Sequence, residues 1–191
     1  LVATASVVLG LDKGISRLSR INVILAGVLL LFVFFTGPTI FILETFVSSL
    51  GTYLHKLPEI SLWMNAEPGN TWQDDWTLFY WSWWISWSPF VGVFSARISR
   101  GRTIREYTLG MLLVPTVATF FWLAVFGGAA LELDVFQQVG ALKQVAVDEP
   151  ALSLHTLLNY LPFPKLMGGL ATLLITIFFI TSSDSGSFVD D

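Results

Sequence analysis

Four long stretches of the sequence contain no charged residue, and this constrains the fold more than any other feature. A helix that crosses the hydrocarbon core of a bilayer needs about 20 consecutive apolar residues, and each stretch reaches or nearly reaches that length. We expect membrane-spanning helices over residues 21–43, 76–96, 107–131 and 166–183. The composition agrees, since 54% of the 191 residues are hydrophobic and only 13% are charged, whereas soluble domains carry about 25% charged residues. The sequence therefore predicts an all-α membrane protein with a single transmembrane domain over residues 1–191.

Residues 1–11 form a shorter apolar stretch at the start of the chain. It is too short to cross a bilayer, and it lacks the initiating Met, the basic flank and the cleavage site of a signal peptide. We interpret it as the end of one more helix. The last apolar stretch also runs almost to Asp191, so we expect the chain to be an internal fragment of a longer protein.

Basic residues gather in two short loops, 12–20 and 97–105, whereas acidic residues dominate the other connections. Basic loops of membrane proteins lie on the cytoplasmic side, so we expect these two loops to be cytoplasmic and residues 61–75 and 132–165 to be external. The basic residues concerned are Lys13, Arg17, Arg20, Arg97, Arg100, Arg102 and Arg105.

This topology allows only two crossings between the basic loops, so residues 40–57 must not cross the membrane. Their pattern is amphipathic, with Leu43, Phe46, Val47, Leu50, Leu54 and Leu57 on one helical face. Such a pattern predicts a helix that lies in the outer membrane interface. The alternative is that the segment continues the first span past Gly37 and Pro38.

Half of the eight tryptophans lie within the seven residues 81–87. Tryptophans near a membrane surface often form an aromatic belt, and Trp72 and Trp76 suit that interpretation. At a rise of about 1.5 Å per residue, Trp83 lies roughly 10 Å and Trp87 roughly 16 Å deeper than Trp76. That depth is the middle of a core about 30 Å thick.

The spacing of these rings places four of them on one helical face: Tyr80, Trp83, Trp84 and Trp87. Converging aromatic faces can bind a quaternary ammonium group without a carboxylate, so one interpretation is a substrate box. The other is packing between helices, and the residues alone do not decide between them.

Pro89 has no amide hydrogen, which removes the helical partner of the Ile85 carbonyl. A plain proline kink explains this, but broken helices also mark the binding sites of membrane transporters. The last span ends in a group of hydroxyl residues, Thr181, Ser182 and Ser183, followed by Asp184. These hydroxyls either bond back to their own helix or, with the carbonyl of Phe178, form an oxygen cluster for a hard cation.

Other kinds of site are missing from the sequence. His55 and His155 are isolated, cysteine is absent, and the spans contain no nucleophile or acid–base pair. The sequence therefore favours neither an enzyme nor a bound cofactor. The arginine-rich loop carries no nucleic-acid motif, and contact with lipid explains it more simply.

Several motifs resemble the betaine/carnitine/choline transporter family. The most specific is WSWWISWSPFVG at residues 81–92, followed by ARISRGRTIRE at residues 96–106; GLDKGI at 10–15, FGG at 126–128 and FFITS at 178–182 are similar to the family in the same order. Residues 132–165 match only loosely.

The resemblance implies a fragment of a leucine-transporter-type bundle, in which ten helices form two inverted repeats. It also implies a lipid-embedded cell-membrane protein, often trimeric, that moves a trimethylammonium compound such as betaine, choline or carnitine. On this reading Tyr80, Trp83, Trp84 and Trp87 bind the substrate, and Phe178, Thr181 and Ser182 bind sodium as the coupling ion. The alternatives are a carnitine-type exchanger that needs no ion, and a structural membrane subunit that does not transport.

Overall fold

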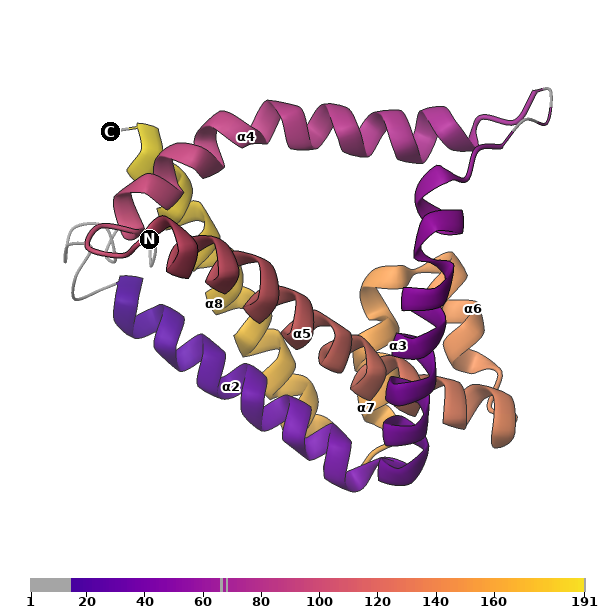
Figure 1. The fold of residues 1–191 in the computed structure, drawn as a ribbon. Coiled ribbons are helices and arrows are strands. Elements are labelled where there is room, and N and C mark those ends of the chain that lie inside the picture. The colour runs from indigo at the N-terminus through magenta and orange to yellow at the C-terminus, as the bar shows by residue number, and fades with distance from the viewer. Residues whose placement is uncertain (1–14, 66, 68, 191) are drawn as a thin grey trace.

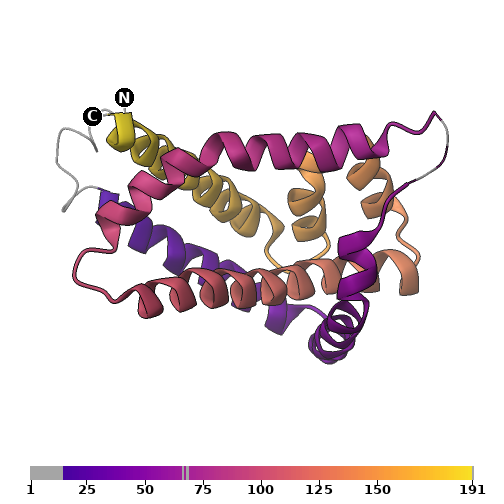
Figure 2. The same cartoon turned by 45° about the horizontal axis from the view of Figure 1, so that its top comes forward.

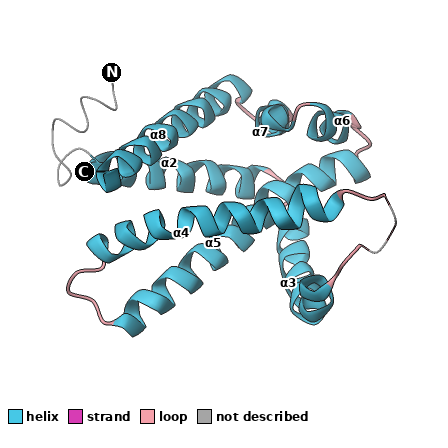
Figure 3. Cartoon of the chain, turned by 90° about the horizontal axis from the view of Figure 1, so that it is seen from above, coloured by secondary structure: helices cyan, strands magenta, loops and turns pink. Residues whose placement is uncertain are grey.

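The computed structural model describes residues 15–65, 67 and 69–190, so the helix end predicted at residues 1–11 lies outside the described residues. Within these residues every regular element is a helix (Figure 3), which confirms the predicted all-α class. The elements are α2 (Ile15–Thr36), α3 (Thr39–Leu62), η1 (Gln73–Leu78), α4 (Phe79–Ile98), α5 (Ile104–Leu131), η2 (Glu132–Phe136), α6 (Ala141–Asp148), η3 (Pro150–Leu152), α7 (Ser153–Asn159) and α8 (Pro164–Asp190).

Three segments are long and apolar enough to cross a membrane: Arg17–Thr36, Ile104–Phe136 and Pro164–Ser183. They correspond to three of the four predicted spans. The α4 helix does not reach the same hydropathy because Trp, Tyr and Ser side chains replace aliphatic ones along it. A crossing over residues 76–96 therefore stays a prediction.

The first apolar stretch is broken where Pro38 follows Gly37, so α2 ends at Thr36 and not at residue 43. Proline cannot donate a helical hydrogen bond and disfavours helical geometry in the residue before it. A Cβ at Gly37 would lie 2.6 Å from the carbonyl oxygen of Val33, so only glycine fits this bend. The predicted end of the span was therefore too late in the sequence.

The amphipathic segment 40–57 forms part of α3, which begins at Thr39 and continues to Leu62 through Pro58. Figure 1 shows α3 turning steeply away from the direction of α2. The chain thus starts a separate helix instead of extending the first span. The position of α3 in the membrane interface stays a prediction.

The core lies where α2, α5 and α8 run together and are closed off by the short helices α6 and α7 (Figure 2). α2 and α8 are antiparallel, because the start of α2 lies at the same end of the bundle as the end of α8 (Figures 1 and 2). The buried cluster consists of Leu29, Val33, Ile42, Val125, Ala129, Leu133, Leu142, Leu157, Leu158, Leu161, Met167 and Ala171. The segment 132–165 therefore contributes buried side chains to the core, and its position outside the membrane stays a prediction.

α4 has a different environment from the other long helices. It is joined to the end of α3 by a segment in which Trp63 and Trp72 meet edge to face at 4.7 Å. It then runs across the bundle to the end of α8 (Figure 1), where Ser95 is buried. The first half of α4, which carries the tryptophans, is exposed.

Candidate functional site

The aromatic residues of α4 form a continuous row along one side of the helix. Their spacing of three or four residues brings each ring against the next. The ring centroids of Tyr80 and Trp83 are 6.0 Å apart, those of Trp83 and Trp87 are 6.5 Å apart, and those of Trp87 and Phe90 are 5.1 Å apart. Trp76 stacks on Tyr80 at 5.9 Å. The row therefore adds Trp76 before, and Phe90 after, the aromatic residues that the sequence predicted to share a face.

A hollow of about 220 Å³ lies against this row, and Trp83, Trp84, Trp87 and Val91 line it. The structure thus brings together three of the four residues predicted to bind the substrate. Tyr80 lies outside the lining and contacts the edge of the group through Trp83. Val91, one turn after Trp87, is a lining residue that the sequence reasoning missed, because an aliphatic side chain in an apolar helix gives no signal.

The ring geometry determines where a cation could bind. The rings of Trp83 and Trp84 are tilted, with centroids 6.0 Å apart, and those of Trp83 and Trp87 are nearly perpendicular, with centroids 6.5 Å apart. Rings at these distances are in contact with one another. A cation would lie in the hollow that these rings line, within about 6 Å of the ring faces, where the attraction to an aromatic face operates.

The hollow is open on its outer side. Trp83, Trp84 and Trp87 expose 47%, 63% and 46% of their surface. Large aromatic groups at mid-membrane depth are normally covered by protein or lipid. The role of the three tryptophans in a substrate site stays a prediction.

The sequence left two interpretations of Pro89, a plain proline kink and a break in the helix. The helix is continuous from Phe79 to Ile98 with Pro89 inside it. The hydroxyl of Ser88 donates a hydrogen bond to the carbonyl oxygen of Ile85 at 2.8 Å, and so replaces the amide that proline lacks. Of these two interpretations the structure favours the unbroken helix, because a neighbouring side chain satisfies the carbonyl.

The predicted cation ligands lie near the end of the third apolar segment, on α8. The hydroxyl of Thr181 donates to the carbonyl oxygen of Phe178 at 3.0 Å. Earlier on α8, Thr172 and Thr176 bond to carbonyls four residues back, whereas Thr181 reaches only three residues back. Of the two predicted hydroxyl ligands, Thr181 is the one that the structure joins to the Phe178 carbonyl.

This pair of oxygens fits a hard cation. Both are neutral oxygens, the kind of ligand that a hard cation prefers. Calcium, a cation of similar size to sodium, takes oxygen ligands at about 2.3–2.6 Å, so two oxygens 3.0 Å apart can share one ion. The side chain of Ser182 is exposed next to them. The two predicted sites lie on helices that pack against each other, α4 and α8.

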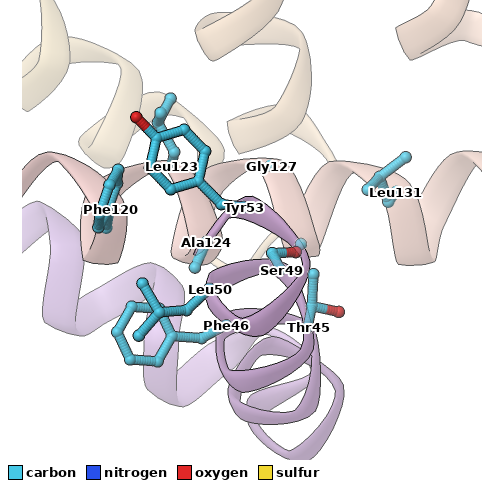
Figure 4. A pocket seen from close by; sticks show the side chains of 11 residues that line it. Thr45, Phe46, Ser49, Leu50, Tyr53, Phe120, Leu123, Ala124, Gly127 and Leu131 are labelled. Carbon is cyan, nitrogen blue, oxygen red and sulfur yellow. The ribbon is translucent and has the colours of Figure 1, made fainter. Parts of the chain in front are cut away.

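A second hollow, of about 420 Å³, lies between α3 and α5 (Figure 4). It contains none of the predicted site residues. Tyr53 and Phe120 meet edge to face beside it at 5.3 Å, and Thr45 and Ser49 contribute hydroxyls. Its lining contains no tryptophan, in contrast to that of the hollow on α4.

Within the described residues, no group of three or more His, Cys, Asp or Glu side chains could hold a metal ion. His155 instead pairs with Thr172 across α7 and α8, with 3.1 Å between Nε2 and Oγ1.

The chain was compared with known protein families. The model for the betaine/carnitine/choline family transporters (BCCT) matches residues 1–191.

Curated relatives give the same match. The chain is 45% identical over 190 residues to a glycine betaine transporter of Acinetobacter baylyi, covering 100% of this chain and 29% of the relative. It is 46% identical over 182 residues to the glycine betaine transporter OpuD of Bacillus subtilis, covering 94% and 35%. It is 43% identical over 191 residues to the osmo-independent choline transporter BetT1 of A. baylyi, covering 99% and 36%. The chain thus spans about a third of the length of these relatives.

Proposed function

Because this chain belongs to the betaine/carnitine/choline transporter family, we propose that the complete protein is a secondary transporter of a trimethylammonium compound. Its membership places it among multi-pass membrane transporters and not among enzymes. The relatives above are named for glycine betaine and for choline, and both compounds carry a trimethylammonium head. The proposed substrate is therefore a compatible solute or its precursor, and the proposed role is osmoprotection.

The observation that carries this proposal is the hollow lined by Trp83, Trp84 and Trp87. A trimethylammonium group has no N–H donor, so hydrogen bonds cannot recognise its charge. The faces of indole rings attract it electrostatically, each by about 0.5–2 kcal/mol depending on how well water is excluded. The open side of the hollow would be covered by other helices of the complete transporter.

We propose alternating access as the mechanism. The indoles hold the cationic head near the middle of the membrane, and the helices on either side rock so that the site opens first outward and then inward. The row of packed rings keeps the three indoles fixed relative to one another on a continuous α4. This proposal includes the two inverted repeats that the family resemblance implies. It also includes a homotrimeric assembly in the membrane.

We further propose that transport is coupled to sodium. The Phe178 carbonyl, the Thr181 hydroxyl and the Ser182 hydroxyl would hold the ion, which would couple substrate movement to its own gradient. The support is the pair of neutral oxygens 3.0 Å apart on a helix that packs against α4. An ion bound to α8 would favour substrate binding on the adjacent α4 if both ligands stabilise the same arrangement of the two helices.

Two other functions make different predictions. An ion-independent exchanger of carnitine-like molecules would use the same tryptophans but would transport equally well without sodium. A structural subunit would lose folding, and not ligand affinity, when the tryptophans are replaced.

The test is an uptake panel on the full-length protein in proteoliposomes, with radiolabelled betaine, choline and carnitine. The proposal predicts accumulation of at least one of them when an inward sodium gradient is imposed, and little when potassium replaces sodium. Equal uptake in both salts would support the exchanger. No uptake of any of the three by a correctly folded protein would contradict the transport proposal.

A further inference from the structure

Trp83 is the indole that connects the lining of the α4 hollow, because its ring contacts both other lining indoles. Its centroid lies 6.0 Å from that of Trp84 and 6.5 Å from that of Trp87. It also contacts a ring that does not line the hollow, that of Tyr80, at 6.0 Å and an interplanar angle of 59°. The orientation of Trp83 therefore depends in part on a residue outside the hollow.

The direction of helical side chains makes this contact a support for Trp83. The Cα–Cβ bonds of an α-helix tilt toward its N-terminus, so a large side chain lies over the turn before its own Cα. Trp83 therefore leans toward the turn that carries Tyr80, and Tyr80 leans toward the turn that carries Trp76. Each of these rings rests on the ring about one turn earlier, as the contacts between them show.

Tyr80 is itself held by two rings. Trp76 stacks on it with centroids 5.9 Å apart and planes only 12° apart, and Phe79 meets it edge to face at 5.5 Å. Trp76 belongs to η1, and the Phe79 amide donates a hydrogen bond to the Trp76 carbonyl oxygen where η1 joins α4. A chain of ring contacts thus runs from η1 to the lining of the hollow.

We propose that Trp76 and Tyr80 are positioning residues of the substrate site: Trp76 fixes the ring of Tyr80, and Tyr80 fixes the indole of Trp83. The inference rests on the proposed function and adds how the site keeps its shape. Neither Trp76 nor Tyr80 lines the hollow, so we expect neither to contact the trimethylammonium head. The attraction of a cation to an indole needs the ring face within about 6 Å. A Trp83 ring that is free to turn away therefore binds the head more weakly.

Two other roles for these rings make different predictions. If they serve only packing, replacing them lowers stability but leaves the affinity of the folded protein unchanged. If Tyr80 is a direct ligand, its replacement weakens binding whether or not Trp83 is present. A positioning residue acts through Trp83, so its effect on affinity disappears once Trp83 has been replaced.

The experiment measures equilibrium binding of radiolabelled betaine and choline to the purified full-length protein, with the melting temperature of each variant recorded in parallel. The matched control is Trp63→Leu, which removes one ring of the pair formed by Trp63 and Trp72, 4.7 Å apart. That pair shares no ring with the row on α4. The test variants are Trp76→Leu, Tyr80→Leu, Trp76→Phe, Tyr80→Phe, and each of the two leucine variants combined with Trp83→Leu.

We expect Trp76→Leu and Tyr80→Leu each to bind about two- to tenfold more weakly, the factor that corresponds to the loss of one aromatic pair. Trp76→Phe and Tyr80→Phe should restore most of the affinity, because each keeps a ring at its position. Trp63→Leu should bind like the wild type. In the Trp83→Leu background, neither leucine substitution should weaken binding further.

Unchanged affinity in folded Trp76→Leu and Tyr80→Leu proteins, with weaker binding by Trp83→Leu, would overturn this inference and leave the proposed substrate site in place. A loss in Tyr80→Leu that is equally large with and without Trp83 would make Tyr80 a ligand and would also overturn it. If Tyr80→Leu does not fold, Trp76→Leu with and without Trp83 decides in the same way. Binding of neither compound by the folded wild type would overturn the proposed function together with the inference.

Discussion

The hydroxyl of Ser88 donates a hydrogen bond of 2.8 Å to the carbonyl oxygen of Ile85, which is the carbonyl that Pro89 leaves without a helical partner. This bond lets α4 continue through its proline from Phe79 to Ile98. Because the helix is continuous, Trp87 and Val91 stay on the same side of it and both line the hollow. The shape of the candidate substrate site therefore depends on a serine that does not itself form the aromatic row.

We expect Ser88→Ala to destabilise the protein by about 1 kcal/mol, because the carbonyl of Ile85 loses its partner. Pro89→Ala restores an amide hydrogen at the position that normally bonds this carbonyl. In a Pro89→Ala background, Ser88→Ala should then cost much less. Thermal unfolding, followed by circular dichroism, measures the destabilisation by Ser88→Ala in the two backgrounds. Equal destabilisation in both would show that the hydrogen bond does not support the helix.

The predicted topology can be tested by chemical labelling. The full-length protein without native cysteines would carry a single cysteine at Ser99 or at Gln138. A membrane-impermeant thiol reagent should label Gln138→Cys from outside intact cells and Ser99→Cys only from the cytoplasmic side, because the loop around Ser99 is basic. Labelling of both from the same side would overturn the assignment of residues 132–165 to the exterior.

The contact between α3 and α5 depends on a glycine. A Cβ at Gly128 would lie 3.3 Å from Cγ1 and 3.5 Å from the Cα of Ile42, whereas a Cβ at Gly127 would meet nothing within 4 Å. We expect Gly128→Leu to separate the two helices and to destabilise the protein by about 1–3 kcal/mol through overpacking. Gly127→Leu is the matched control on the same helix and should be tolerated better. Equal melting temperatures for the two variants would contradict the close approach of Ile42.

The predicted sodium ligands make a specific kinetic prediction. Thr181→Ala combined with Ser182→Ala should raise the sodium concentration for half-maximal uptake much more than it lowers the amount of protein in the membrane, because two ligand oxygens are lost. Thr176→Ala, which removes a hydroxyl bonded to the carbonyl of Thr172, is the control on the same helix. An unchanged sodium dependence in the double variant would remove these residues from the site.

The helical class and the shared face of the aromatic residues could be predicted from the sequence, because both follow from the period of an α-helix. The side chains of Trp83, Trp84 and Trp87 are large and three or four residues apart, so their contact is decided within α4. The break at Gly37 and Pro38 could have been placed correctly too, since the effect of proline on the preceding residue is local.

Features that depend on contacts between distant segments could not be predicted in this way. Asn22, in α2, is a single amide in an apolar run, and only the folded structure shows that it is buried, with an Oδ1 atom that has no hydrogen-bond partner among the described residues. The leucines of α7 look like those of any external loop until the fold brings Leu157 and Leu158 into the core. The bond from Ser88 was missed for a different reason, because several hydrogen-bond acceptors lie within reach of a serine hydroxyl in a helix.

The central claim is that the hollow on α4 binds the trimethylammonium head, and the most direct test is equilibrium binding of radiolabelled betaine or choline to the purified full-length protein. Trp84→Leu and Trp87→Leu each remove an indole from the lining, and Trp81→Leu removes one that lies outside it and is 64% exposed. The account predicts that the first two variants fold but bind up to about thirtyfold more weakly, and that Trp81→Leu binds like the wild type. Unchanged affinity in both Trp84→Leu and Trp87→Leu would contradict it and assign these tryptophans to helix packing.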